Sequence, residues 1–108
     1  MTRVRYEIWE DEFILECKGH AGYADAGNDI VCAGISTLVQ TLTSYLPEIT
    51  DKEEIKISSG EVFCMAKGAE ALTCFKMILA GLRMLESSYP QYLQITEGCT
   101  IKSENPLQ

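Results

Sequence analysis

Two residues of this chain could together cleave a peptide bond: the single histidine, His20, and Cys32, twelve residues later. Cysteine catalysis needs a thiolate that attacks a carbonyl carbon and an imidazole that protonates the leaving amine. The spacing does not by itself bring the two side chains together. It permits their contact, because a loop rich in glycine connects them, and a strand end and the next helix start are usually close in space. The pair is therefore a candidate thiolate–imidazolium dyad.

The position of Cys32 favours this chemistry. Asn28 or Asp29 is a good N-cap, so Cys32 is expected in the first turn of a helix. The helix dipole and unpaired backbone N–H groups there favour the thiolate. Those N–H groups could also receive the carbonyl oxygen of a tetrahedral intermediate. At about 100° per residue, Cys32 lies roughly 80° from the centre of the apolar face, which predicts a half-exposed side chain.

Two other interpretations compete with the dyad. A lone cysteine in an amphipathic helix is usually a small buried hydrophobe, and a lone loop histidine is usually solvated. Cys17-x-x-His20 also has the spacing of half a zinc site, with Cys32 as a third ligand. The sequence offers no second pair at metal spacing, however, and Cys17 is in phase with the inward residues Phe13 and Leu15. We therefore expect no metal and no cofactor.

Hydrophobic periodicity predicts the elements that must position the pair. A strand alternates from Val4 to Ile8, Glu10-Asp11-Glu12 is expected to turn, and Phe13, Leu15 and Cys17 face inward from a second strand while Ile14, Glu16 and Lys18 face outward. Residues 19–28 form a loop. The remaining elements follow in order: a helix with the stripe Val31, Ile35, Leu38, Leu42 and Leu46, ended by Pro47; strands at Ile55–Ile57 and Val62–Ala66; a helix over about 69–87; and a strand at 92–96 that could continue to 100–101.

The order ββαββαβ predicts an α+β fold, a single-domain two-layer sandwich over residues 1–108 with a mostly antiparallel sheet and two helices. Phe63 and Met65 give the fourth strand apolar residues on both faces, which fits a central strand or a subunit contact. Residues 102–108 are expected to be a frayed tail.

Composition narrows the function. The chain has 108 residues and a net charge of −7, which argues against a broad nucleic-acid-binding surface. An acidic surface suits a basic partner, but it also simply keeps a protein soluble. The N-terminus lacks the apolar core of a signal peptide, and the apolar stretches fall short of the roughly 20 residues that span a bilayer. Five cysteines without such a signal indicate free thiols in a cytoplasmic protein with no membrane association.

Residues 19–36 resemble the signature of a known family, the ribosomal-processing cysteine proteases (Prp). The signature is Gly-His-Ala near a strand end, a glycine-containing loop, and Asp-Ile-Val-Cys-Ala at a helix start. Gly19-His20-Ala21 matches the first block and Asp29-Ile30-Val31-Cys32-Ala33 the second. The chain length and element order are also compatible with this family.

The resemblance implies a cysteine endopeptidase that removes the N-terminal extension of a large-subunit ribosomal protein and forms a homodimer. It implies that His20 and Cys32 are the catalytic dyad and that Asp29 supports them, as helix cap or imidazole orienter. Gly22, Tyr23 and Gly27 would belong to the substrate loop. The alternative is a catalytically idle, ribosome-associated binding protein with the same fold. Such a protein would have no reason to keep Cys32 reactive.

Overall fold

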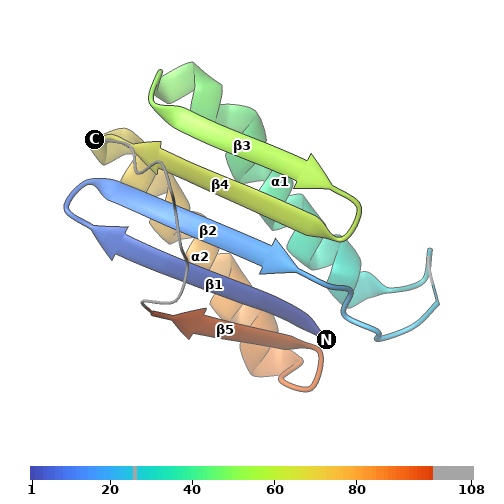
Figure 1. The fold of residues 1–108 in the computed structure, drawn as a ribbon. Coiled ribbons are helices and arrows are strands. Elements are labelled where there is room, and N and C mark those ends of the chain that lie inside the picture. The colour runs from blue at the N-terminus through green and yellow to red at the C-terminus, as the bar shows by residue number, and fades with distance from the viewer. Residues whose placement is uncertain (26, 99–108) are drawn as a thin grey trace.

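A computed structural model describes residues 1–25 and 27–98 of the chain. Two hairpins alternate with two helices, and a last strand follows (Figure 1). The expected order ββαββαβ is confirmed, with these bounds: β1 Thr2–Trp9, β2 Glu12–Lys18, α1 Ile30–Ile49, β3 Glu53–Ser58, β4 Glu61–Lys67, α2 Ala69–Ser88 and β5 Leu93–Glu97.

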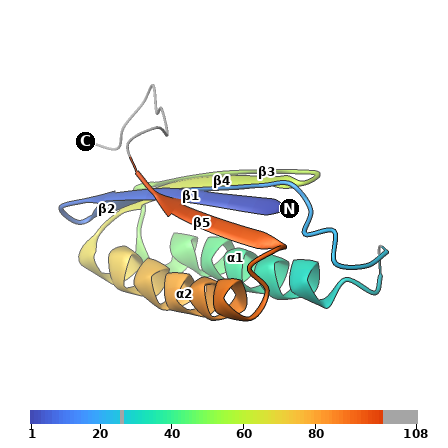
Figure 2. The same cartoon turned by 90° about the horizontal axis from the view of Figure 1, so that it is seen from below.

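The five strands form one sheet in the order β3-β4-β2-β1-β5. All neighbours pair antiparallel except β1 and β5, which are parallel. Both helices lie on the same face of this sheet (Figure 2). The structure therefore confirms the predicted two-layer α+β sandwich. β4 lies between β3 and β2, and this interior position accounts for its apolar residues on both faces.

The core fills the space between the helices and the sheet. Phe13 and Leu15 of β2 are fully buried there, and Phe13 stacks on Phe75 of α2 with ring centroids 4.3 Å apart. The two helices approach closely because glycines face leucines: a Cβ on Gly81 would lie 2.9 Å from Leu38. This contact fixes α1 against α2 and so fixes the end of α1 that carries Cys32.

The prediction for α1 is wrong in two details. Pro47 does not end the helix, which continues to Ile49 and closes with the Thr50 N–H donated to the Leu46 carbonyl. A proline in the last turn removes only one helical hydrogen bond, and burial of Leu46 holds the turn in place. Val39, which lies outside the predicted stripe, is fully buried, while Leu38 is partly buried and packs against the core at the helix–helix contact.

The β1–β2 hairpin also differs from expectation. The turn needs only Glu10 and Asp11, because Glu10 adopts a φ of 55°. Glu12 is therefore the buried first residue of β2, with Oε1 3.6 Å from Lys67 Nζ. Ile14, expected on the polar face, is buried with Met65 on the face opposite the helices, where Trp9 and Phe63 pack against them.

Three further expectations concern length and ends. By length and composition α1 is apolar enough to cross a membrane, contrary to the expectation that no stretch is. Its apolar side chains are instead accounted for by the core, since the stripe from Val31 to Leu46 packs on the sheet. The proposed continuation of the last strand at 100–101 and the tail at 102–108 lie outside the described residues.

Candidate active site

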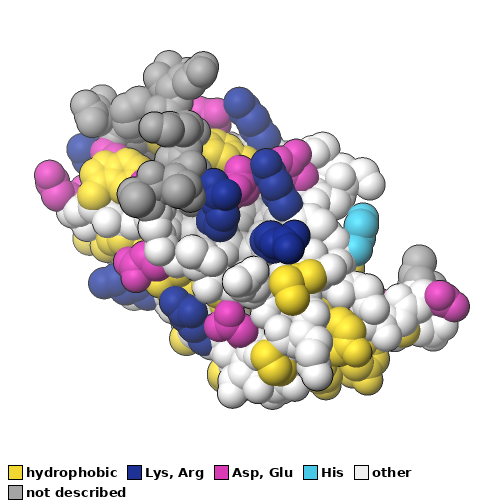
Figure 3. All heavy atoms as spheres, turned by 60° about the horizontal axis from the view of Figure 1, so that its bottom comes forward, with side chains coloured by type: hydrophobic (Ala, Val, Ile, Leu, Met, Phe, Trp, Pro, Cys, Tyr) yellow, Lys and Arg dark blue, Asp and Glu magenta, His cyan; other side chains and the backbone are white. Residues whose placement is uncertain are grey.

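Three segments meet at one end of the sheet: the end of β2, the turn between β3 and β4, and the start of α1 (Figure 1). The Gly19 N–H donates to the Gly60 carbonyl at 2.8 Å, which ties the end of β2 to the β3–β4 turn. His20 follows immediately and is exposed; histidine is coloured cyan in Figure 3. Cys32 is half-buried in the first turn of α1, as its angular position predicts.

His20 and Cys32 line the same two hollows. The first, of about 130 Å³, lies between α1 and the β3–β4 hairpin and has apolar walls that include Ile35, Val39 and Val62. The second, of about 540 Å³, lies between α1 and the loop that follows His20. A peptide laid across the junction of these hollows would pass both the thiol and the imidazole.

Asp29 holds the start of α1 and the loop together. Its Oδ1 accepts from the Cys32 N–H at 2.8 Å, and its Oδ2 accepts from the Tyr23 N–H at 3.0 Å. Backbone hydrogen bonds, that of Cys32 first, lower the pKa of the Asp29 carboxyl below its ordinary value, so it stays ionised at neutral pH. Of the two supporting roles considered, the structure shows helix capping; it records no contact between Asp29 and the His20 ring among the described residues.

The same capping corrects one expectation. The N–H groups of the helix start were expected to be free for a substrate carbonyl. Instead, the Cys32 N–H is donated to the Asp29 side chain and the Ala33 N–H to the Asp29 carbonyl. These two amides are already satisfied and do not form an oxyanion hole in this arrangement.

The loop residues divide between two places. Gly22 and Gly27 line the second hollow. Tyr23 is not among the residues that line either of the two hollows; its ring meets Tyr89 and Tyr92 edge-on, with centroids 5.6 and 5.3 Å away. Tyr23 therefore anchors the loop to the segment between α2 and β5, while the two glycines face the site.

Two other thiols, Cys17 and Cys64, are buried and have raised pKa values, so they are protonated at neutral pH. Burial, and secondarily the nearby Cys32, raises the pKa of Cys17 to about 11. Burial raises the pKa of Cys64 to about 12.

Among residues 1–25 and 27–98, no group of three or more His, Cys, Asp or Glu side chains could hold a metal ion.

Two residues of the site were not singled out from the sequence as functional. Ser36 lines both hollows one helical turn after Cys32, and its i+4 spacing is the signal that could have placed it there. Gly60 was predicted only as part of a turn. Its contact with the histidine is long-range, and no local pattern reveals it.

A thiol and an imidazole at shared hollows, on a two-layer α+β sandwich, indicate a cysteine hydrolase, and the comparisons define its class as a cysteine protease. The family model for cysteine protease Prp matches residues 1–94, so the chain belongs to the Prp family of ribosomal processing cysteine proteases.

Sequence relatives agree with this assignment, and solved structures share the fold. The chain is 31% identical over 85 residues to the ribosomal processing cysteine protease Prp of Mycoplasma genitalium, covering 77% of this chain and 86% of the relative. Identity to the Mycoplasma pneumoniae protease is 27%, with 77% and 85% covered. The fold resembles the essential ribosomal processing protease Prp from S. aureus in complex with a covalently linked product peptide, at a TM-score of 0.81, 22% identity and coverage of 91% and 100%. SMU.848 from Streptococcus mutans has a TM-score of 0.70, 22% identity and coverage of 90% and 93%.

Proposed function

We propose that this protease removes the N-terminal extension of a large-subunit ribosomal protein, with Cys32 as nucleophile and His20 as general acid and base. The observation that carries the proposal is that both side chains line the same two hollows, with Cys32 in the first turn of α1. Support also comes from the S. aureus Prp, which has been crystallised with a substrate peptide and with a covalently linked product peptide.

The proposed reaction has two steps. The Cys32 thiolate attacks the scissile carbonyl carbon, the carbonyl electrons move to oxygen, and the intermediate collapses as the C–N bond breaks. His20 gives its proton to the departing amine. It then takes a proton from water, whose oxygen attacks the thioester and releases the carboxylate product and the thiolate. Asp29 contributes by holding Cys32 at the helix start.

The partners follow from the same proposal. The substrate is a protein precursor made in the cytoplasm, where free thiols persist. The net charge of −7 favours a basic ribosomal protein over nucleic acid as the direct partner. No cofactor is needed by the two steps above.

We also propose a homodimer. Family resemblance supports it, and so do Met77 and Met84, which are 69% and 73% exposed on the outer side of α2. Light scattering at micromolar concentration should give twice the 12.0 kDa of one chain. A mass of one chain would remove this part of the proposal.

The decisive test is to incubate the protein with the ribosomal protein precursor of its own organism and to measure the mass of the product by mass spectrometry. The native chain should shorten the precursor, and Cys32→Ala should leave it intact while keeping its fold, because a half-buried thiol leaves little cavity. Cys74→Ala, which changes a half-buried thiol of α2, is the matched control and should retain activity. Binding without shortening by the native protein would instead support the idle binding protein.

A further inference from the structure

The turn between β3 and β4 approaches the histidine of the proposed dyad. Gly60 is the last residue of this turn and adopts a φ of +72°, a left-handed conformation that L side chains rarely take. Its carbonyl accepts the Gly19 N–H at 2.8 Å, one residue before His20. The backbone on both sides of this hydrogen bond is therefore held in register with the imidazole.

The imidazole lies directly over Gly60. A Cβ added to Gly60 would lie 3.1 Å from His20 Nε2, 3.6 Å from Cε1 and 3.8 Å from Cδ2. The first distance is shorter than an ordinary van der Waals contact, so a side chain at this position would require the ring to move by a few tenths of an ångström. Glycine here serves two ends: it permits the turn, and it leaves the space that the ring occupies.

Little else restrains the ring. His20 is exposed, and within the described part of the chain its ring makes no hydrogen bond or ion pair. A ring held only by packing is sensitive to the shape of what it packs on. The turn that supports it belongs to the hairpin that also walls the first hollow, through Ile57 and Val62.

We propose that Gly60 is a positioning residue of this protease: its missing side chain sets where the His20 imidazole rests relative to Cys32. The inference rests on the proposed function, because it gives Gly60 a role through the histidine of that dyad. Gly60 also lines the first hollow, together with Cys32 and His20. Measurements made without substrate therefore separate an effect of its substitution on the ring from an effect on the hollow itself.

Two substitutions separate backbone strain from loss of space. Gly60→Ala adds a Cβ at a strained φ, whereas Gly60→Asn adds a Cβ on a residue that tolerates left-handed backbone. Gly68→Ala is the control for strain, which is greater there because the φ of Gly68 lies farther from the left-handed region. Gly68 has a φ of +134°, lies at the N-cap of α2, and an added Cβ there would meet Thr50 Oγ1 at an ordinary 3.9 Å.

Both Gly60 variants should lower kcat for precursor cleavage roughly tenfold, because the ring must move by a few tenths of an ångström to admit the Cβ. Gly68→Ala should lower thermal stability and leave kcat unchanged. The chain has one histidine, so its ring signals in NMR spectra are unambiguous. They should shift in Gly60→Ala and Gly60→Asn and stay in place in Gly68→Ala.

A double-mutant comparison tests that Gly60 acts through His20. His20→Ala should slow alkylation of Cys32, and adding Gly60→Ala should slow it no further. A native kcat in folded Gly60→Asn or unshifted histidine signals would each overturn the inference. So would a further slowing of Cys32 alkylation in the His20→Ala background that equals the slowing caused by Gly60→Ala alone. If Cys32→Ala still cleaves the precursor, the proposed function fails; the histidine signals then still decide whether Gly60 places the ring.

Discussion

At the scale of single residues, the described thiols of this protein differ in exposure, and burial raises the pKa of two of them. Cys17 and Cys64 are buried, with pKa values raised to about 11 and about 12, so both remain protonated near neutral pH. Cys32 is half-buried and opens onto two hollows. Reaction with a small electrophile requires both access and the thiolate form.

We therefore predict that limiting iodoacetamide near pH 7.5 modifies Cys32 before Cys17, Cys64 or Cys74. A Cys99→Ser background keeps the comparison to the thiols that the structure describes. Peptide mapping over time gives the order. The labelling of Cys17 and Cys64 should grow as the pH rises toward their raised pKa values. Labelling of another thiol first would contradict the assignment of Cys32 as nucleophile.

Asp29 links folding to the site through hydrogen bonds that need its charge. Its pKa is lowered in the folded protein, so its contribution to stability is complete above the ordinary Asp value of 3.8 and is lost as the pH falls through the lowered value. Asp29→Ala should lower the Tm at pH 7, and Asp29→Ser, which keeps a capping oxygen, should lower it less. The difference between native protein and Asp29→Ala should shrink below about pH 4. A difference that is constant down to pH 2 would show that the charge of Asp29 is not used.

Local pattern was sufficient to predict part of the site. A capping Asp three residues before Cys32, and the angle of Cys32 from the apolar stripe, correctly predicted a half-exposed thiol in a first helical turn. The amides of Cys32 and Ala33 were wrongly expected to be free, because the same cap that starts the helix also satisfies them. Gly60 was missed because it meets His20 across forty residues of chain.

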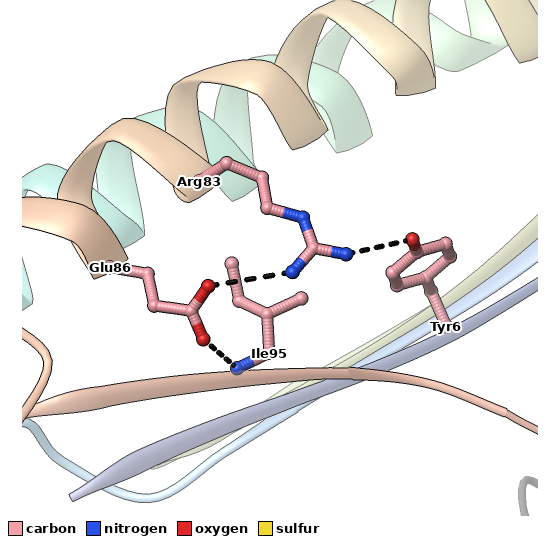
Figure 4. A network of polar contacts seen from close by, with 4 residues as sticks. All are labelled: Tyr6, Arg83, Glu86 and Ile95. Atoms are coloured by element: carbon pink, nitrogen blue, oxygen red, sulfur yellow. Dashed lines mark hydrogen bonds and ion pairs between the residues drawn. The ribbon is translucent and has the colours of Figure 1, made fainter.

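At the scale of elements, α2 is joined to two strands by a polar network (Figure 4). Arg83 Nη2 donates to the Tyr6 hydroxyl of β1 at 3.0 Å, and Arg83 Nη1 lies 3.4 Å from Glu86 Oε1. Glu86 Oε2 accepts the backbone N–H of Ile95 at 2.8 Å. This N–H belongs to the edge strand β5, so Glu86 satisfies a group that the sheet leaves unpaired.

Glu86→Ala should therefore destabilise the protein by about 1–2 kcal/mol, because it removes a charge-assisted hydrogen bond and leaves the Ile95 N–H without its acceptor. Urea unfolding followed by circular dichroism measures this. Glu97→Ala, which changes an exposed carboxylate on β5, is the control and should stay within about 0.5 kcal/mol of the native value. Equal midpoints for the two variants would show that the network does not stabilise the edge.

The sequence predicted which elements form more reliably than where they end and what covers them. Period-two and four-three spacings correctly predicted the strands and the two helices that the structure describes in residues 1–25 and 27–98. Pro47 was expected to end α1, but burial of Leu46 outweighs one lost hydrogen bond. Alternation correctly assigned Ile14 to the face of the sheet that points away from the helices. Its burial on that face was not predicted, because it depends on Met65, Trp9 and Phe63, which are distant in the sequence.

At the scale of the whole molecule, net charge affects the rate at which the protein and its proposed substrate encounter each other. The chain carries −7 at neutral pH, whereas a protein that binds ribosomal RNA is basic because it neutralises phosphates. Opposite net charges raise the rate of encounter, and dissolved salt screens this attraction over roughly 10 Å at 0.1 M. Under the proposed function, contacts of the substrate with the apolar walls of the first hollow would add a part of recognition that salt does not screen.

We predict that kcat/KM for the intact precursor falls on the order of tenfold between about 0.02 M and about 0.5 M salt. A short uncharged peptide that spans the cleavage site should change by less than about twofold, because it engages the hollows without the long-range attraction. Comparing the two substrates at each salt concentration removes any general effect of salt on the enzyme. An equal response of both substrates would mean that the acidic surface serves solubility alone and that recognition is confined to the groove beside Cys32 and His20.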